Sequence, residues 1–99
     1  MVTLGLLATL HAKPGKEDEV ASLLSGAQPL AEAEEGTVTW FAFKVDEQTY
    51  GIFDAFGDDA ARQAHLNGQI AAALMDKADE LLSSPPDIKP VDLLGSKLP

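Results

Sequence analysis

The sequence predicts a single α+β domain built on one antiparallel sheet. Segments rich in β-branched and aromatic residues alternate with segments in which apolar residues recur every three or four positions. Short breaker clusters rather than a long linker separate these segments. With 99 residues the chain has the length of one domain. We therefore expect residues 1–99 to fold as one unit.

The first ten or so residues predict a strand. Residues 2–11 are β-branched and leucine-rich, and they stop at the breaker Lys13-Pro14-Gly15. No basic residue precedes the short apolar run, which argues against a signal peptide. The run is also far shorter than the roughly 20 apolar residues that cross a bilayer.

A helix follows from Pro14. Pro29 lies inside its pattern and predicts a kink near Ser25-Gly26, because proline removes a backbone hydrogen bond. Gly36 is expected to end the helix. The apolar stripe that defines it consists of Val20, Leu23, Leu24, Ala27, Leu30 and Ala31.

The rest of the chain predicts a hairpin with strands at 37–45 and 49–56, a helix that reaches about residue 66, a helix over roughly 69–82 and a last strand at 88–94. Gly57-Asp58-Asp59 offers an N-cap for the first of these helices, and Pro90 predicts either an edge position or a bulge for the last strand. The order β-α-β-β-α-α-β is the ferredoxin-like arrangement, a four-stranded antiparallel sheet with helices on one face.

The strands are apolar on both faces, although a sheet with one face in water should alternate apolar and polar residues. In the second strand one face carries Val38, Trp40 and Ala42, and the other carries Phe41, Phe43 and Val45. In the first strand, Leu4, Leu6, Ala8 and Leu10 oppose Gly5 and Leu7. Helices on one side cannot cover both faces. We therefore expect a homodimer, a ligand cavity, or both.

Composition excludes several classes of partner. The chain has 16 acidic and 7 basic residues, for a net charge of −9. This field repels phosphate backbones and anionic lipid, so we expect neither nucleic acid nor a membrane as partner. The absence of cysteine excludes disulfides and thiolate catalysis and fits a cytoplasmic protein.

Two motifs, "HAKPGKEDEV" before the first helix and "IFDAFGDDAARQAHL" in the second half, resemble the antibiotic biosynthesis monooxygenase family of the dimeric α+β barrel superfamily. The resemblance implies a dimer whose sheets pack face to face into a barrel, with a pocket between sheet and helices in each subunit. Characterised relatives oxidise quinol-like or polyketide aromatics with dioxygen and without metal or flavin, and others degrade haem.

His65 and Asp54 are the candidate catalytic residues. The ordinary pKa of histidine suits a base, His65 shares a helix face with Ala61 and Ala64, and it matches the family's Ala-His pattern. Asp54 stands where relatives usually carry glutamate, and it could orient His65. The alternatives are a buried histidine that docks its helix, and an Asp54 that pairs with Arg62 or Lys44 or lies at a solvated edge.

Trp40, Tyr50 and Phe56 are candidate walls of the substrate pocket, although each of them suits ordinary core packing as well. Phe56 occupies a position that is often tryptophan in relatives, so the ring is kept and the N–H donor is lost. Ile70 stands where quinol-oxidising relatives often have a second histidine. The helix at 69–82 carries no histidine, which argues against haem degradation.

Three functions remain open. The first is a cofactor-independent monooxygenase that oxidises a small phenolic, quinol or polyketide-type aromatic with dioxygen. The second is a non-catalytic homodimer that binds a small aromatic molecule in the same pocket, and the third is a purely structural dimer. The acidic residues at 32–35 and 58–59 are interpreted as surface and helix-terminus charges, because their spacing does not suggest a metal cage. We therefore predict no metal, and the resemblance implies no cofactor.

Overall fold

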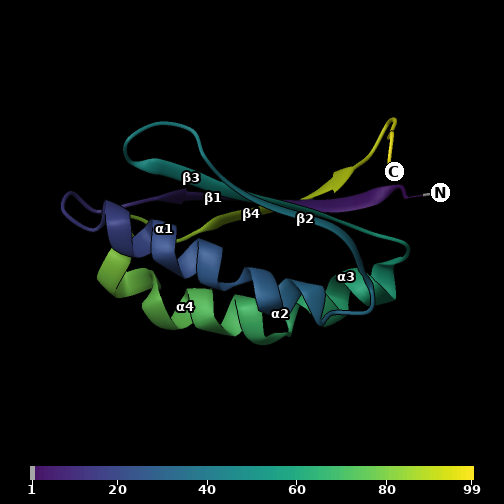
Figure 1. Cartoon of the computed structure of the whole chain (residues 1–99), viewed down its shortest axis with the longest axis horizontal. Coiled ribbons are helices and arrows are strands. Elements are labelled where there is room, and N and C mark those ends of the chain that lie inside the picture. Colours follow the sequence, from purple (N-terminus) through teal and green to yellow (C-terminus); the bar gives the residue numbers. More distant parts are fainter. Residues whose placement is uncertain (1) are drawn as a thin grey trace.

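The fold has two layers, a sheet on one side and helices on the other (Figure 1). The computed structural model of the chain describes residues 2–99. Its elements are β1 (Leu4–His11), α1 (Glu17–Gly26), α2 (Gln28–Glu32), β2 (Thr37–Lys44), β3 (Thr49–Phe56), α3 (Asp59–Leu66), α4 (Gln69–Leu81) and β4 (Asp87–Asp92). Within residues 2–99, the four strands form one antiparallel sheet in the order β2-β3-β1-β4. The predicted α+β, ferredoxin-like fold is confirmed.

The local sequence signals in the second half of the chain predict the positions of β3, α3 and β4 correctly. β3 has the predicted bounds, and α3 ends at Leu66 as predicted. Its N-cap is Asp58, which accepts a hydrogen bond from the backbone N–H of Ala61 at 2.8 Å. This bond satisfies one of the free N–H groups at the start of α3. β4 lies at an edge of the sheet, which is one of the two alternatives that Pro90 predicts.

The first helical region differs from the prediction at its end. The expected kink is a break, because α1 ends at Gly26 and α2 starts at Gln28, with Pro29 in its first turn. The prediction that Gly36 ends the helix is wrong, since α2 already ends at Glu32. The backbone N–H of Thr37 instead donates to the carbonyl of Glu34 at 3.4 Å and closes a turn.

Gly36 has a packing role in that turn. A Cβ atom at this position would lie 2.7 Å from Cβ of Ala61 on α3. The turn can therefore approach α3 closely only because the residue is glycine. This close approach brings residues 34–37 next to the helix that carries His65.

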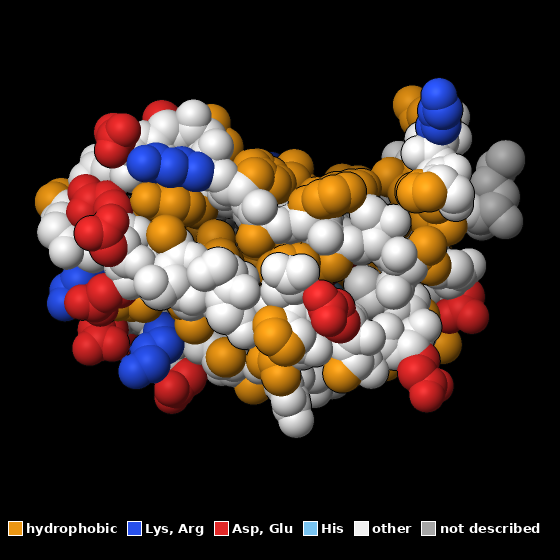
Figure 2. Space-filling model, viewed as in Figure 1, with side chains coloured by type: hydrophobic (Ala, Val, Ile, Leu, Met, Phe, Trp, Pro, Cys, Tyr) orange, Lys and Arg blue, Asp and Glu red, His pale blue; other side chains and the backbone are white. Residues whose placement is uncertain are grey.

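The two faces of the sheet have different environments. The inner face packs on the helices, and its buried residues include Leu10, Tyr50, Ile52 and Phe56. On the outer face Phe41, Phe53 and Leu7 form a row across β2, β3 and β1. Phe41 is 59% exposed and Leu7 is 37% exposed. Figure 2 shows hydrophobic side chains gathered along the upper part of the view, where the sheet lies.

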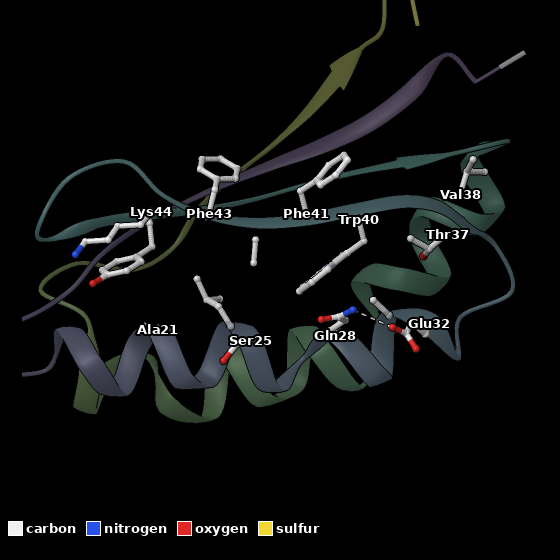
Figure 3. Close-up of a pocket in the computed structure, with 14 residues that line it drawn as sticks. Ala21, Ser25, Gln28, Glu32, Thr37, Val38, Trp40, Phe41, Phe43 and Lys44 are labelled. Atoms are coloured by element: carbon white, nitrogen blue, oxygen red, sulfur yellow. Dashed lines mark hydrogen bonds between the residues drawn. The ribbon is translucent and has the colours of Figure 1, made fainter. Parts of the chain in front are cut away.

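Val38 departs from the predicted alternation. We expect it to share a face with Trp40, but the pairing register shifts between Thr37 and Thr39, so the strand bulges at this point. Val38 points to the side opposite Trp40 and is largely exposed (Figure 3). The expectation for Val38 is therefore wrong, and those for Trp40 and Phe41 are correct.

The helices formed by residues 2–99 include none that is both long enough and apolar enough to cross a membrane.

Replacement of Gly36 by alanine should destabilise the fold. The added methyl group would push the turn away from Ala61, and overpacking of this kind costs about 1–3 kcal/mol. Urea unfolding followed by circular dichroism would measure the loss. The matched control is Gly26→Ala, because a Cβ atom there meets nothing within 4 Å and alanine favours a helix by up to about 1 kcal/mol. Equal stabilities of the two variants would contradict the packing role of Gly36.

Candidate functional site

His65 lies between two carboxylates that come from different parts of the chain. Its Nε2 atom is 2.8 Å from Oδ2 of Asp54 on β3, and its Nδ1 atom is 2.7 Å from Oε1 of Glu34 in the turn before β2. Asp54 is fully buried and His65 is 8% exposed. The structure thus brings the predicted pair together and adds Glu34. We call these three residues the charge cluster.

The partners that the sequence left open for Asp54 are engaged elsewhere. The Arg62 guanidinium pairs with Asp59 at 3.0 Å, and the Lys44 ammonium lies 3.5 Å from the Glu47 carboxylate. Asp54 lies in an inner strand of the sheet, between β2 and β1, and therefore not at a solvated edge. Its charge is compensated by His65.

The cluster raises the pKa of His65 to about 9 from an ordinary value of 6.5. Burial is the largest single influence and lowers the pKa, but the contacts with Asp54 and Glu34 together outweigh it. At neutral pH the ring is therefore a cation, and both nitrogens carry protons. Nδ1–H donates to Glu34. The contact with Asp54 is an ion pair without hydrogen-bond alignment, and within residues 2–99 neither oxygen of Asp54 has an aligned donor.

A cavity of about 700 Å³ lies between β2 and the helices α1 and α2 (Figure 3). Trp40 points from β2 toward these helices, whereas Phe41 and Phe43 point to the other side of the strand. The predicted pocket residues Trp40 and Tyr50 both line the cavity. Its remaining lining comes from Ala21, Leu24, Ser25, Gln28, Ala31, Glu32, Thr37, Val38, Phe41, Ala42, Phe43 and Lys44.

The other predicted site residues lie outside this lining. His65, Asp54 and Phe56 line neither this cavity nor the smaller apolar one of about 220 Å³ beneath α1 and α4. Phe56 is fully buried, and its ring centroid is 5.3 Å from that of His65. Phe56 therefore packs against the charge cluster.

Thr37 connects the cluster to the large cavity. Its side chain lines the cavity, and its hydroxyl donates to Oε1 of Glu34 at 2.7 Å. Sequence reasoning missed both residues, because Glu34 belongs to an acidic run typical of surface charge. The contact between Glu34 and His65 is a tertiary one, and no local pattern in the sequence predicts it. The described residues, 2–99, contain no group of His, Asp or Glu side chains arranged to hold a metal ion.

The charge cluster should make stability depend on pH. Because the pKa of His65 is raised on folding, its stabilisation is fully present below pH 6.5 and is lost as the pH rises through about 9. Over that range the free energy of unfolding should fall by on the order of 2–3 kcal/mol more in the wild type than in His65→Gln. Urea unfolding at a series of pH values would measure this difference.

The control for that series is His11→Gln, which removes an exposed histidine at the end of β1. It should retain the full alkaline loss of stability. Parallel pH profiles for wild type and His65→Gln would show that the cluster does not hold His65 as a cation.

Comparison with known proteins finds a relative of high sequence identity and several proteins that share the fold at low identity. No protein-family model matches the sequence, and no curated protein matches it. A solved protein of unknown function from Nitrosomonas europaea, NE2512, is 60% identical, with a TM-score of 0.98, over 100% of this chain and 96% of that one.

Two further structures carry the name of the family that the motifs resemble. A candidate antibiotic biosynthesis monooxygenase from Nitrosomonas europaea is 12% identical, with a TM-score of 0.83, over 93% of this chain and 99% of that one. A structure described as an antibiotic biosynthesis monooxygenase is 17% identical, with a TM-score of 0.80, over 93% and 99%. The chain therefore belongs to one family with the NE2512 protein and has the fold of the antibiotic biosynthesis monooxygenases.

Proposed function

We propose that the protein binds a small aromatic molecule with phenolic or quinol character in the large cavity and oxidises it with dioxygen, without metal or flavin. The observation that carries the proposal is the cavity itself, which has room for a two- or three-ring molecule and is lined by Trp40, Tyr50, aliphatic side chains and a few polar ones. The shared fold supports the reaction class. We place this activity in the cytoplasm.

The reaction needs a proton acceptor and no external reductant. When the CH₂ group of an anthrone becomes C=O, one oxygen atom of dioxygen enters the carbonyl and the other leaves as water. The substrate first loses a proton to become electron-rich. We propose His65 as the base and Asp54 as the residue that orients it, with the proton passing through Thr37 and Glu34 because His65 is outside the cavity.

A second candidate function is binding without turnover. It is favoured by the state of His65, whose two ring nitrogens both face carboxylates at neutral pH. A cation of this kind has no lone pair with which to accept a proton. In this case the charge cluster only holds α3 against the sheet, and the cavity sequesters its ligand.

The pH dependence of oxygen uptake separates these two functions. If neutral His65 is the base, kcat with an anthrone should rise tenfold per pH unit below about 9 and then level off. His65→Gln should lose this rise and at least 100-fold in rate. An oxygen electrode and absorbance of the quinone product would measure both. Oxygen uptake by His65→Gln at the wild-type rate would refute the role of His65.

The site of binding is checked by a matched pair of variants. Ala21→Phe places a ring in the cavity from the exposed face of α1, whereas Ala72→Phe adds the same ring to an exposed position on α4 outside the cavity. Only Ala21→Phe should weaken binding of the anthrone. Saturable binding without oxygen consumption at any pH would favour sequestration.

We also propose that the outer face of the sheet is a homodimer interface. Phe41, Phe43 and Leu7 leave large apolar surfaces in water on a face that the helices do not reach. A two-fold axis would pack the outer face of one subunit against the same face of a second subunit, so that both apolar surfaces are removed from water. Stable interfaces of this kind bury roughly 800 Å² on each partner.

Leu7→Asp should convert the dimer to a monomer, because it would bury an unpaired carboxylate between the two sheets. Sedimentation velocity over a range of concentrations would show the change, with circular dichroism to confirm folding. Met75→Asp is the control, since Met75 is also an exposed apolar residue but lies on α4, in the helical layer on the other side of the molecule. A wild-type protein that is monomeric at high concentration would refute the dimer.

A further inference from the structure

Thr37 is the point at which the apolar cavity meets the buried charge cluster. Its hydroxyl is hydrogen-bonded to Oε1 of Glu34 at 2.7 Å, and the same oxygen lies 2.7 Å from Nδ1 of His65. Glu34 is thus shared between a cavity-lining hydroxyl and a buried imidazolium. The turn that contains both residues is held by Gly36 against α3.

The number of protons fixes the role of the Thr37 hydroxyl. A hydroxyl has one proton and two lone pairs, and the proton of Thr37 is donated to Glu34. Glu34 also accepts from the protonated His65 ring, so its Oε1 atom acts only as an acceptor. With its proton committed in this way, Thr37 can offer a bound molecule only a lone pair. A rotating hydroxyl could serve as donor or acceptor, whereas this one is restricted to accepting.

Three other polar side chains of the cavity have partners of their own, whereas the indole N–H of Trp40 is buried without one among residues 2–99. The Gln28 amide donates to Glu32 at 3.0 Å, and the Ser25 hydroxyl donates to the Ser22 carbonyl at 3.3 Å. The Lys44 ammonium lies 3.5 Å from Glu47. Thr37 differs from these residues because its hydroxyl is oriented by the ion pair of Glu34 and His65.

We propose that Thr37 is the specificity-determining residue of the cavity, accepting a hydrogen bond from the hydroxyl of the bound aromatic while Glu34 holds it as an acceptor. The inference rests on the proposed binding function and deepens it. A ligand with a phenolic or alcoholic O–H matches this acceptor, and an ether of the same shape does not. A carboxylate ligand is disfavoured further, because Glu34, His65 and Asp54 together carry a net charge of −1.

The test compares three probes built on one naphthalene ring system: 2-naphthol, 2-methoxynaphthalene and 2-naphthoate. Binding is followed in ¹H–¹⁵N NMR spectra through the indole N–H signal of Trp40, the single tryptophan of the chain and a cavity residue. The wild type should bind 2-naphthol roughly 3- to 10-fold more tightly than the methyl ether, as expected for one hydrogen bond. It should bind 2-naphthoate most weakly.

Thr37→Val keeps the shape of the side chain and removes the hydroxyl. It should make the affinities for 2-naphthol and its methyl ether equal, because only the binding of 2-naphthol is weakened. Thr37→Ser keeps the hydroxyl and should restore the preference. Ser25→Ala, which removes another cavity hydroxyl, should leave the preference unchanged. Glu34→Gln should reduce the preference, because an amide can present a donor to Thr37 and free its proton.

The outcomes separate this inference from the function on which it rests. If the naphthol and the ether bind the wild type equally, the role of Thr37 is wrong and the binding cavity stands. If no probe shifts the Trp40 signal, the cavity is not a binding site and both proposals fail. The comparison of probes in the wild type decides the inference even where a Thr37 variant does not fold.

Discussion

The structure depends on one ion pair network, in which the His65 imidazolium lies between Asp54 and Glu34. Asp54 is fully buried on an inner strand, and a buried carboxylate without a cation is strongly destabilising. The cation comes from α3, so the helix must lie where its last turn reaches the sheet. Glu34 then joins the turn before β2 to the same ring. Three segments that are distant in sequence are thereby held at one point.

This network also divides the interior into two environments. On one side lies the charge cluster, in which Asp54 and His65 are buried and the ring of His65 packs against that of Phe56. On the other side lies a large cavity with mostly apolar walls, and Thr37 is the residue that contacts both. Hydrogen bonds link the cluster to the cavity through that hydroxyl, and the net charge of the cluster also acts on a molecule in the cavity across the distance between them. The charged residues that orient the Thr37 hydroxyl therefore lie outside the cavity, and Thr37 is the lining residue that is bonded to them.

Local patterns in the sequence account for most of the fold and for half of the site. The bounds of β3 and the cap region and end of α3 are predicted because alternation, a turn and the cap residues are all local signals. The pairing of His65 with Asp54 is predicted because each projects from its element toward the other layer. Glu34 and the end of α2 are missed, since both are decided by the packing of Gly36 against Ala61. That contact involves residues 25 positions apart, and no periodicity encodes it.

The arrangement of β2 explains why a ligand cavity and an apolar outer face occur together. β2 is an edge strand of the sheet, and because side chains alternate along any strand, those of β2 point in turn to the cavity and to the outer face (Figure 3). Trp40 and Ala42 belong to the cavity, while Phe41 and Phe43 lie on the outer side and also reach the cavity rim. A second copy seated on the outer face would cover these two phenylalanines and narrow the same opening. Dimerisation and ligand binding would then depend on the same strand. Because the dimer would exclude water from the cavity, the hydrogen bond between Thr37 and the ligand would become stronger.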